Sequence, residues 1–259
     1  MPTESRSPLV LIGGVGELFQ GDLDLGRVAA ERLQAEDLGE HVLVEDFHYG
    51  AVAVAQRIQE LKPAHLVLIG GIVRGRAPAS VTRALVDGSA FDPADMQLAV
   101  GDAVTGYVSI DLVVEVAAGL GVLPGRTVTV EVEPASVELC DHLSAQVVDV
   151  LDEVLDLVRA EVRRAPLLDI ADQIRRRLEA ESDRLGESPA AETLLELVES
   201  IRSLGEHGRW GRVFVQRERL RRQLDAGETG EGMDTLDWAL WWALLEELDK
   251  VFGAEAGSS

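Results

Sequence analysis

Carboxylate and imidazole side chains follow the strand-like segments in the first half of this 259-residue chain. Asp22 and Asp24 come shortly after the first apolar run, Asp46 and His48 end the second, and Asp102 follows the fourth. Such side chains suit a first-row transition metal, so Asp24, Asp46, His48 and Asp102 are candidate metal ligands. The other interpretation is structural, because acidic side chains also stabilise a helix N-terminus through its dipole or lie in solvated loops.

A glycine-rich loop, Gly13-Gly-Val-Gly16, follows the first apolar run, Leu9-Val-Leu-Ile12. It invites comparison with the dinucleotide-binding pattern G-x-G-x-x-G, whose third glycine lets helix and strand pack beside the pyrophosphate. Phe19 stands at that third position, and Glu17 and Asp22 would face the phosphates with like charge. We therefore expect no bound dinucleotide.

The elements that must position these side chains alternate between strand and helix. Apolar runs that stop at glycine suit strands buried on both faces, and apolar residues at helical spacing suit amphipathic helices. We predict strands over 9–12, 41–45, 65–69, 96–100 and 128–132, and helices over 22–34, 51–61, 109–120 and 139–162. The 128–132 segment alternates apolar with polar residues, which indicates a half-buried strand.

This rhythm predicts an α/β fold, a doubly wound and mostly parallel sheet with helices on both faces. Ligands of such sheets bind beyond the carboxyl ends of the strands. The loops expected to form the site are therefore residues 13–26, 46–50, 70–78 and 101–109.

The second half of the chain is helix-like. We predict helices over 167–185, 190–204, 209–226 and 234–252. Pro166 disfavours a helical residue before it, so we expect a helix to break near 163–166. The predicted organisation is an α/β domain at 1–163 and an all-helical domain at 164–259.

Two features of the helical half are candidate partner-binding surfaces. Trp238 and Trp241 recur at helical spacing, and exposed tryptophan is enriched where binding energy concentrates. Arg217 and Arg221 belong to a basic stretch that could receive an acidic segment. The structural alternatives are a buried tryptophan stripe in the core and a solvated arginine-rich helix.

Composition excludes several classes of function. With 24 Lys and Arg against 46 Asp and Glu, the net charge is −22, which disfavours nucleic acid and anionic membranes as partners. The single cysteine, Cys140, excludes an internal disulfide framework and a cysteine-rich metal site. No apolar run is long enough to span a bilayer, and no apolar signal core follows the N-terminus, so we expect a cytoplasmic protein.

The stretch from Leu9 to Ala30 and the elements after it resemble the hydrogenase maturation endopeptidases, which cut a C-terminal extension from the large subunit of a nickel–iron hydrogenase. That family opens with a strand and a G-x-G-N-x-x-x-x-D-[DE]-x-x-G loop. Gly16-Glu-Leu-Phe-Gln-Gly-Asp22 to Gly26 fits this loop with Glu17 in place of Asn. His65-Leu-Val-Leu-Ile-Gly-Gly-Ile-Val-Arg-Gly-Arg-Ala-Pro78 fits the strand and small-residue loop that follow, and the resemblance covers roughly residues 8–160.

The resemblance implies the family's fold and a hydrogenase context, but the ligand positions differ. The family holds the substrate's nickel through three side chains, and the matching positions here are Leu23, Gly70 and Thr105. Leucine and glycine offer no side-chain donor, and a threonine hydroxyl is a poor nickel ligand. We therefore expect a non-catalytic relative, without a cofactor, that binds a hydrogenase subunit or maturation protein. The expected crevice residues are Gly16, Glu17, Asp22 and Gly71.

Two alternatives stay open. An active, nickel-dependent endopeptidase would need metal contacts moved to Asp24, Asp46, His48 or Asp102. An unrelated small-ligand binder is the other alternative, because a fold does not fix a function.

Overall fold

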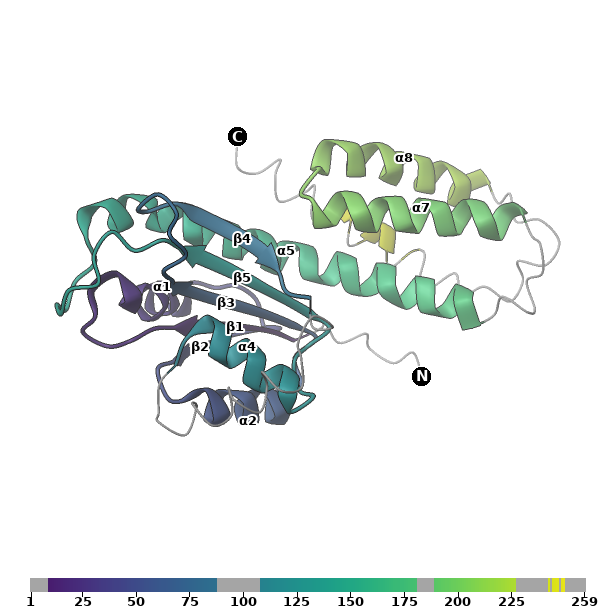
Figure 1. The fold of residues 1–259 in the computed structure, drawn as a ribbon. Helices are drawn as coiled ribbons and strands as arrows, with labels where there is room; N and C mark the ends of the chain where they lie inside the picture. The colour runs from purple at the N-terminus through teal and green to yellow at the C-terminus, as the bar shows by residue number, and fades with distance from the viewer. Residues whose placement is uncertain are drawn as a thin grey trace. The chain divides into compact units, whose positions relative to one another are not determined.

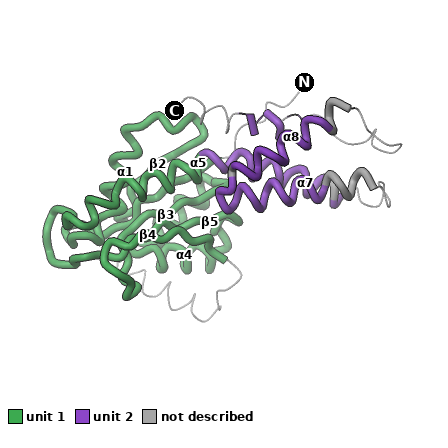
Figure 2. Tube along the Cα trace, turned by 90° about the horizontal axis from the view of Figure 1, so that it is seen from above, with its two compact units in different colours: residues 1–162 green, residues 163–259 purple. Residues whose placement is uncertain are grey.

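The computed structural model describes residues 9–87, 108–180, 189–226, 242, 244–246 and 248–249. The chain divides into two compact units, Met1–Val162 and Arg163–Ser259 (Figure 2). The first unit is built on a sheet and the second on helices.

A five-stranded sheet of order β2-β1-β3-β5-β4 forms the centre of the first unit (Figure 1). The parallel strands are β1 (Val10–Val15), β2 (Val42–Phe47), β3 (His65–Gly71) and β5 (Arg126–Val132). The edge strand β4 (Val81–Leu85) runs antiparallel to β5. The prediction of an α/β fold with a mostly parallel sheet is confirmed, whereas β4 was not predicted and the expected strand at 96–100 lies outside the described residues.

Helices cover both faces of this sheet (Figure 1). On one face lie α1 (Leu25–Gln34), which follows the short 3-10 helix η1 (Gly21–Asp24), and the first part of α5 (Ala145–Ala180). On the other face α2 (Ala51–Leu61) packs beside α4 (Ile110–Gly119). Core residues Leu11, Leu66 and Leu68 point from the strands into the α2–α4 layer.

The connections between the strands show where in the sheet a binding site is expected. The chain leaves β1 through α1 to β2, then crosses through α2 to β3 on the opposite side of β1. The strand order therefore reverses between β1 and β3, and in doubly wound sheets a crevice opens at this point, beyond the carboxyl ends of the two strands.

The second unit is helical throughout its described residues, as predicted. The latter part of α5, α7 (Pro189–Glu206) and α8 (Trp210–Ala226) enclose its core. Buried residues from these helices include Ile174, Ile201, Val213 and Leu220, and Leu244 joins them from the last described segment. None of the helices in the described ranges combines the length and apolarity needed to cross a bilayer.

The expected break at Pro166 is wrong, because α5 runs unbroken from Ala145 to Ala180. An interior proline costs a helix about 3 kcal/mol through one lost hydrogen bond and a steric clash. Ala165, Leu167 and Leu168 on either side are almost fully buried, and their packing offsets that cost. The helix also begins later than the predicted residue 139, because residues 139–144 form a loop hydrogen-bonded to the β1–α1 connection.

Candidate functional site

A hollow of about 240 Å³ opens where the strand order reverses, at the carboxyl ends of β1 and β3. Its walls come from four segments: the end of β1 and the residues after it, η1, the residues that end and follow β3, and the start of α4. The lining residues are Val15, Gly16, Glu17, Leu23, Gly71, Ile72, Val73, Val108, Ser109, Ile110 and Asp111. Three expected crevice residues, Gly16, Glu17 and Gly71, line this hollow.

Two positions beside the hollow require glycine, because backbone atoms of neighbouring segments approach them closely. A Cβ atom at Gly71 would lie 2.3 Å from the Asp22 carbonyl oxygen, and one at Gly70 would lie 2.6 Å from that of Val15. Real Cβ contacts of this kind do not fall below 3.0 Å. Neither position therefore admits a side chain without a shift of the backbone, and backbone from β1, η1 and β3 forms this part of the site.

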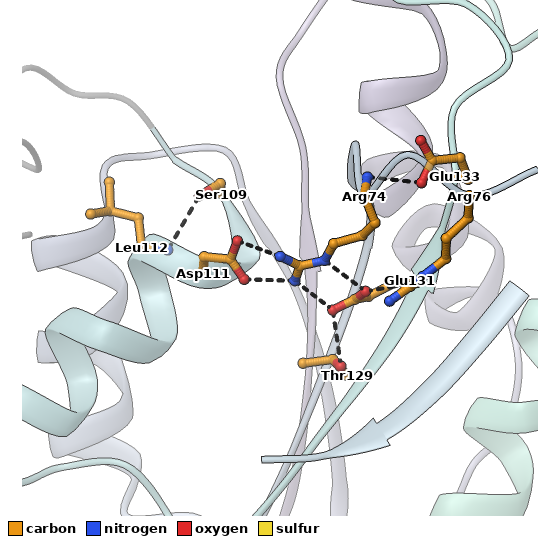
Figure 3. Close-up of polar contacts among 8 residues, drawn as sticks. All are labelled: Arg74, Arg76, Ser109, Asp111, Leu112, Thr129, Glu131 and Glu133. Atoms are coloured by element: carbon orange, nitrogen blue, oxygen red, sulfur yellow. Dashed lines mark hydrogen bonds and ion pairs between the residues drawn. The ribbon is translucent and has the colours of Figure 1, made fainter. Parts of the chain in front are cut away.

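The loop after β3 is held against α4 and β5 by Arg74 (Figure 3). Its guanidinium donates to both Asp111 oxygens, over 2.8 and 2.7 Å, and to both Glu131 oxygens, over 3.2 and 2.9 Å. Asp111 lies in the first turn of α4, while Glu131 is a buried residue near the end of β5. Arg76 adds a further hydrogen bond of 3.1 Å to Glu131. One side of the hollow is thus fixed by ion pairs.

Backbone hydrogen bonds complete this attachment. The Glu133 carboxylate accepts the N–H of Arg74 over 2.8 Å and the N–H of Gly75 over 3.1 Å. Burial works against charge on Glu133, but these backbone donors outweigh it and hold the pKa of its carboxyl below the usual range. Burial likewise opposes charge on Glu131, and the hydrogen bonds from Arg74 and Arg76 prevail and lower the pKa of that carboxyl. Both carboxylates are therefore ionised at neutral pH.

Asp22 has a structural role rather than the expected place in the crevice. Its carboxylate is buried and accepts the N–H groups of Ala135 and Ser136, both over 2.8 Å. It also accepts the N–H of Ser144 over 2.7 Å and the Ser144 hydroxyl over 2.8 Å. Asp22 therefore ties η1 to the loop before α5, a contact that spans more than a hundred residues and leaves no local signal in the sequence.

Of the candidate metal ligands that the structure describes, Asp46 and His48 are in contact, and Asp24 is engaged elsewhere. Asp24 is buried and binds the Arg27 guanidinium, with Nε 3.0 and 2.9 Å from its two oxygens. His48 Nδ1, just after β2, lies 2.9 Å from an oxygen of Asp46, which is near the end of that strand, and Asp102 lies outside the described residues. In the described ranges, no group of three or more His, Cys, Asp or Glu side chains is arranged to hold a metal ion.

The three positions that replace the family's ligands can be placed in part. Leu23 lines the hollow, and Gly70 lies directly beneath it, one residue before the lining residue Gly71. Thr105 lies outside the described residues. Neither Leu23, which lines the hollow, nor Gly70, which is next to a lining residue, offers a side-chain donor.

The arginines predicted to bind a partner contact a carboxylate of their own unit. Arg221 donates to Asp249 over 2.8 Å, and Arg217 hydrogen-bonds the same carboxylate. Arg217 is largely buried as well. The expected anchors Trp238 and Trp241 lie outside the described residues. Partner binding by this unit stays a prediction.

Several solved structures similar to this chain are described as hydrogenase maturation proteases. A hydrogenase 2 maturation peptidase from a Thaumarchaeota archaeon is 22% identical, with 58% of this chain and 95% of that chain covered and a TM-score of 0.42. The maturating endopeptidase HybD from Escherichia coli is 20% identical, with 58% and 89% covered and a TM-score of 0.42. The nickel–iron hydrogenase maturation protease HycI from Thermococcus kodakarensis is 20% identical, with 61% and 94% covered and a TM-score of 0.41.

Neither a protein-family model nor a curated protein matches this sequence. The resemblance drawn from the glycine loop and the order of elements is confirmed as a structural similarity over about 58% of the chain, at low identity.

Proposed function

We propose that this chain is a hydrogenase maturation protease-like protein that binds a segment of a nickel–iron hydrogenase subunit, or of another maturation protein, without cleaving it. The motifs from Leu9 to Pro78 supply the hydrogenase context through their resemblance to the family. The observation that carries the non-catalytic part is the backbone packing at Gly70, where no side chain fits.

Peptide hydrolysis requires a group that polarises the scissile carbonyl and a group that activates water. The carboxylates that line the hollow are already engaged: Asp111 binds Arg74, and Glu17 accepts a hydrogen bond from the Gln20 side chain. Most other lining side chains are apolar, among them Leu23 and Val73. Among the described residues, this lining leaves no unengaged carboxylate for hydrolysis and offers an extended segment both apolar and polar contacts.

Nickel would reach this site only as part of a hydrogenase substrate. Leu23 has no donor atom, and an acidic side chain at Gly70 would collide with the Val15 carbonyl oxygen. The described residues therefore do not fit the substrate's nickel, and we assign no catalytic step through it.

One observation favours the alternative of an active endopeptidase with moved metal contacts. The Asp46 Oδ1 atom is buried without a hydrogen-bond partner, while its carboxylate contacts His48. Burying a hydrogen-bond acceptor without a donor costs free energy, and a bound cation would supply the missing partner. Under this alternative, Asp46→Asn would abolish both metal binding and cleavage.

The test combines binding with a mass measurement. The purified chain is mixed with a nickel-loaded hydrogenase large-subunit precursor, and complex formation and precursor mass are followed together. We expect a stable complex and an unchanged mass. Val73→Glu places a charge on an exposed, apolar lining residue and should weaken the complex at least tenfold.

Leu120→Glu is the matched control, because Leu120 is similarly exposed at the opposite end of α4 and should bind like the unmodified chain. Loss of the C-terminal extension that depends on this protein would overturn the non-catalytic proposal. Absence of any complex would overturn the proposal that the partner is a hydrogenase subunit.

A further inference from the structure

Two exposed apolar segments lie side by side at the edge of the crevice. Leu18 and Phe19 occupy the turn after β1, and Val137 and Leu139 belong to the loop before α5. The segments are joined by backbone hydrogen bonds, from Cys140 N–H to the Phe19 carbonyl over 3.0 Å and from Gly21 N–H to the Cys140 carbonyl over 3.3 Å. We call Leu18, Phe19, Val137 and Leu139 the rim patch.

The rim patch exposes large apolar side chains to solvent. Phe19 is 64% exposed and Leu139 is 85% exposed. A hollow of about 270 Å³ adjoins the turn and is lined by Leu18, Phe19, Asp24, Arg27 and Asp141. Clustered exposed apolar residues beside a hollow are typical of surfaces that bind another molecule.

The backbone of Phe19 adds an independent observation. Its φ of 65° lies in the left-handed region, which glycine adopts freely and an aromatic residue adopts at a cost. The Gln20 N–H to Glu17 carbonyl bond and the bond from Cys140 hold it there. Phe19 is thus both strained and exposed. Nothing in the described part of the fold offsets the free-energy cost of its backbone conformation or of its exposed ring. Such strain concentrates at functional positions.

The charges around the rim patch indicate the chemistry of a partner segment that could bind it. Glu138 and Asp141 are exposed carboxylates on the same loop as Leu139. The nearby cations are already shared, since Arg27 binds both Asp24 and Glu31 and His142 contacts Asp141. The chain as a whole carries a net charge of −22. An anionic apolar surface is complementary to a segment with apolar side chains between basic ones.

We propose that the rim patch docks a segment of a protein partner in which one or two large apolar side chains are flanked by Lys or Arg. The apolar side chain enters the hollow beside Phe19, and the basic side chains face Glu138 and Asp141. The inference rests on the proposed function, because Glu17 lines the crevice and Leu18 lines this hollow, so one partner segment would pass over both.

The experiment uses the full chain and a display library of random twelve-residue peptides. We expect selection of peptides with large apolar residues flanked by basic ones. A selected peptide, synthesised and titrated, should bind Phe19→Gly at least tenfold more weakly than the unmodified chain. Glycine suits the backbone at this position, so this variant should be at least as stable, and weaker binding cannot be attributed to unfolding.

Two controls and one further measurement complete the test. Leu120→Ser removes another exposed apolar side chain, one that does not belong to the rim patch, and should leave peptide binding unchanged. A peptide with its basic residues changed to Glu should not bind. Failure to select such peptides, or equal binding by Phe19→Gly, would overturn the proposal. A micromolar dimer of the unmodified chain that Phe19→Gly dissociates would overturn it too, and would assign the patch to a second copy.

The outcomes also separate this inference from the proposed function. If the selected peptide binds the rim patch but the hydrogenase precursor forms no complex, the docking surface stands and the hydrogenase assignment fails. If the precursor binds equally well to Phe19→Gly, the crevice proposal stands and the rim-patch inference fails.

Discussion

Arg74 and Asp111 join the loop after β3 to the first turn of α4 through two parallel hydrogen bonds of 2.8 and 2.7 Å. The pair lies at the hollow, since Asp111 is one of its lining residues. A bidentate arginine–carboxylate pair fixes orientation as well as distance. The contact therefore sets the separation between the two segments that a bound partner would meet.

Asp111→Asn keeps the shape of this side chain and removes its charge. Because Asp111 is half exposed, we expect the free energy of unfolding to fall by about 0.5–1 kcal/mol. Urea unfolding measures this change. Asp156→Asn removes the acid of a more exposed pair with Arg159, and its effect should be smaller. Equal effects would contradict a special role for the Arg74 pair.

Glu131→Gln should lower stability in a pH-dependent way. The variant loses charge-assisted hydrogen bonds from Arg74 and Arg76, so we expect a loss of about 2 kcal/mol at pH 7. The pKa of Glu131 is lowered in the folded state, and its contribution is therefore complete above the unfolded pKa of about 4.5 and is lost as pH falls through the folded value.

The measurement is urea unfolding of both proteins at several pH values from 7 to 3. The difference between them should stay constant down to about pH 5 and shrink below it. A difference that grows on acidification would show that folding raises the pKa of Glu131 instead of lowering it.

Asp22→Asn should be among the most destabilising single-atom changes in the first unit. The carboxylate accepts four hydrogen bonds from Ala135, Ser136 and Ser144, and an amide would turn donor hydrogens toward some of these donors. We expect a loss of about 3 kcal/mol, measured by thermal or urea unfolding. Asp152→Asn, at a highly exposed position, is the control and should change stability little. A small effect at Asp22 would contradict its structural role.

Gly70→Ala tests the close packing beneath the crevice. The added methyl group would meet the Val15 carbonyl oxygen at 2.6 Å, and we expect a loss of about 2–3 kcal/mol. Gly125→Ala is a matched control, because a Cβ there meets nothing within 4 Å. Gly70→Asp should not create a nickel site, and saturable nickel binding by that folded variant in calorimetry would contradict the steric argument.

Ala79→Gly should stabilise the protein. Ala79 has a φ of 60° where the chain enters β4, with its N–H bonded to the Glu133 carbonyl over 2.8 Å. Glycine adopts this left-handed conformation without steric cost, and we expect a gain of about 0.5–1 kcal/mol in the free energy of unfolding. A loss of stability would mean that the greater freedom of glycine in the unfolded chain outweighs the relief of strain.

The sequence predicted the sheet in part because two of its parallel strands, β1 and β3, contain apolar runs that stop at glycines, Gly13 and Gly70. It did not predict β4, because an edge strand is only half covered and has no continuous apolar run. The alternation in 128–132 predicted a half-buried strand, whereas all of these residues, Glu131 included, are buried. Glu131 is buried because Arg74 and Arg76, more than fifty residues earlier in the chain, cover it and match its charge.

Part of the candidate functional site was also predictable from the sequence. The edge of the sheet followed from topology, and the expected crevice residues Gly16, Glu17 and Gly71 line the hollow at that edge. The partners of Asp22 did not, because they depend on a loop that precedes α5. Pro166 shows the opposite case, in which a reliable local signal is overridden by burial of Leu167 and Leu168.

The four donors to Asp22 have a consequence for the order of events during synthesis. They lie at residues 135–144, whereas the carboxylate that accepts their hydrogen bonds belongs to residue 22, which is synthesised much earlier. β5, which separates β3 from β4, is likewise made only at residues 126–132. A nascent chain that has emerged only as far as β3 therefore has an open sheet edge, and Asp22 lacks its native hydrogen-bond donors. The first unit can reach its native state only after residue 144 has left the ribosome, and until then its apolar strands depend on protection from outside the chain.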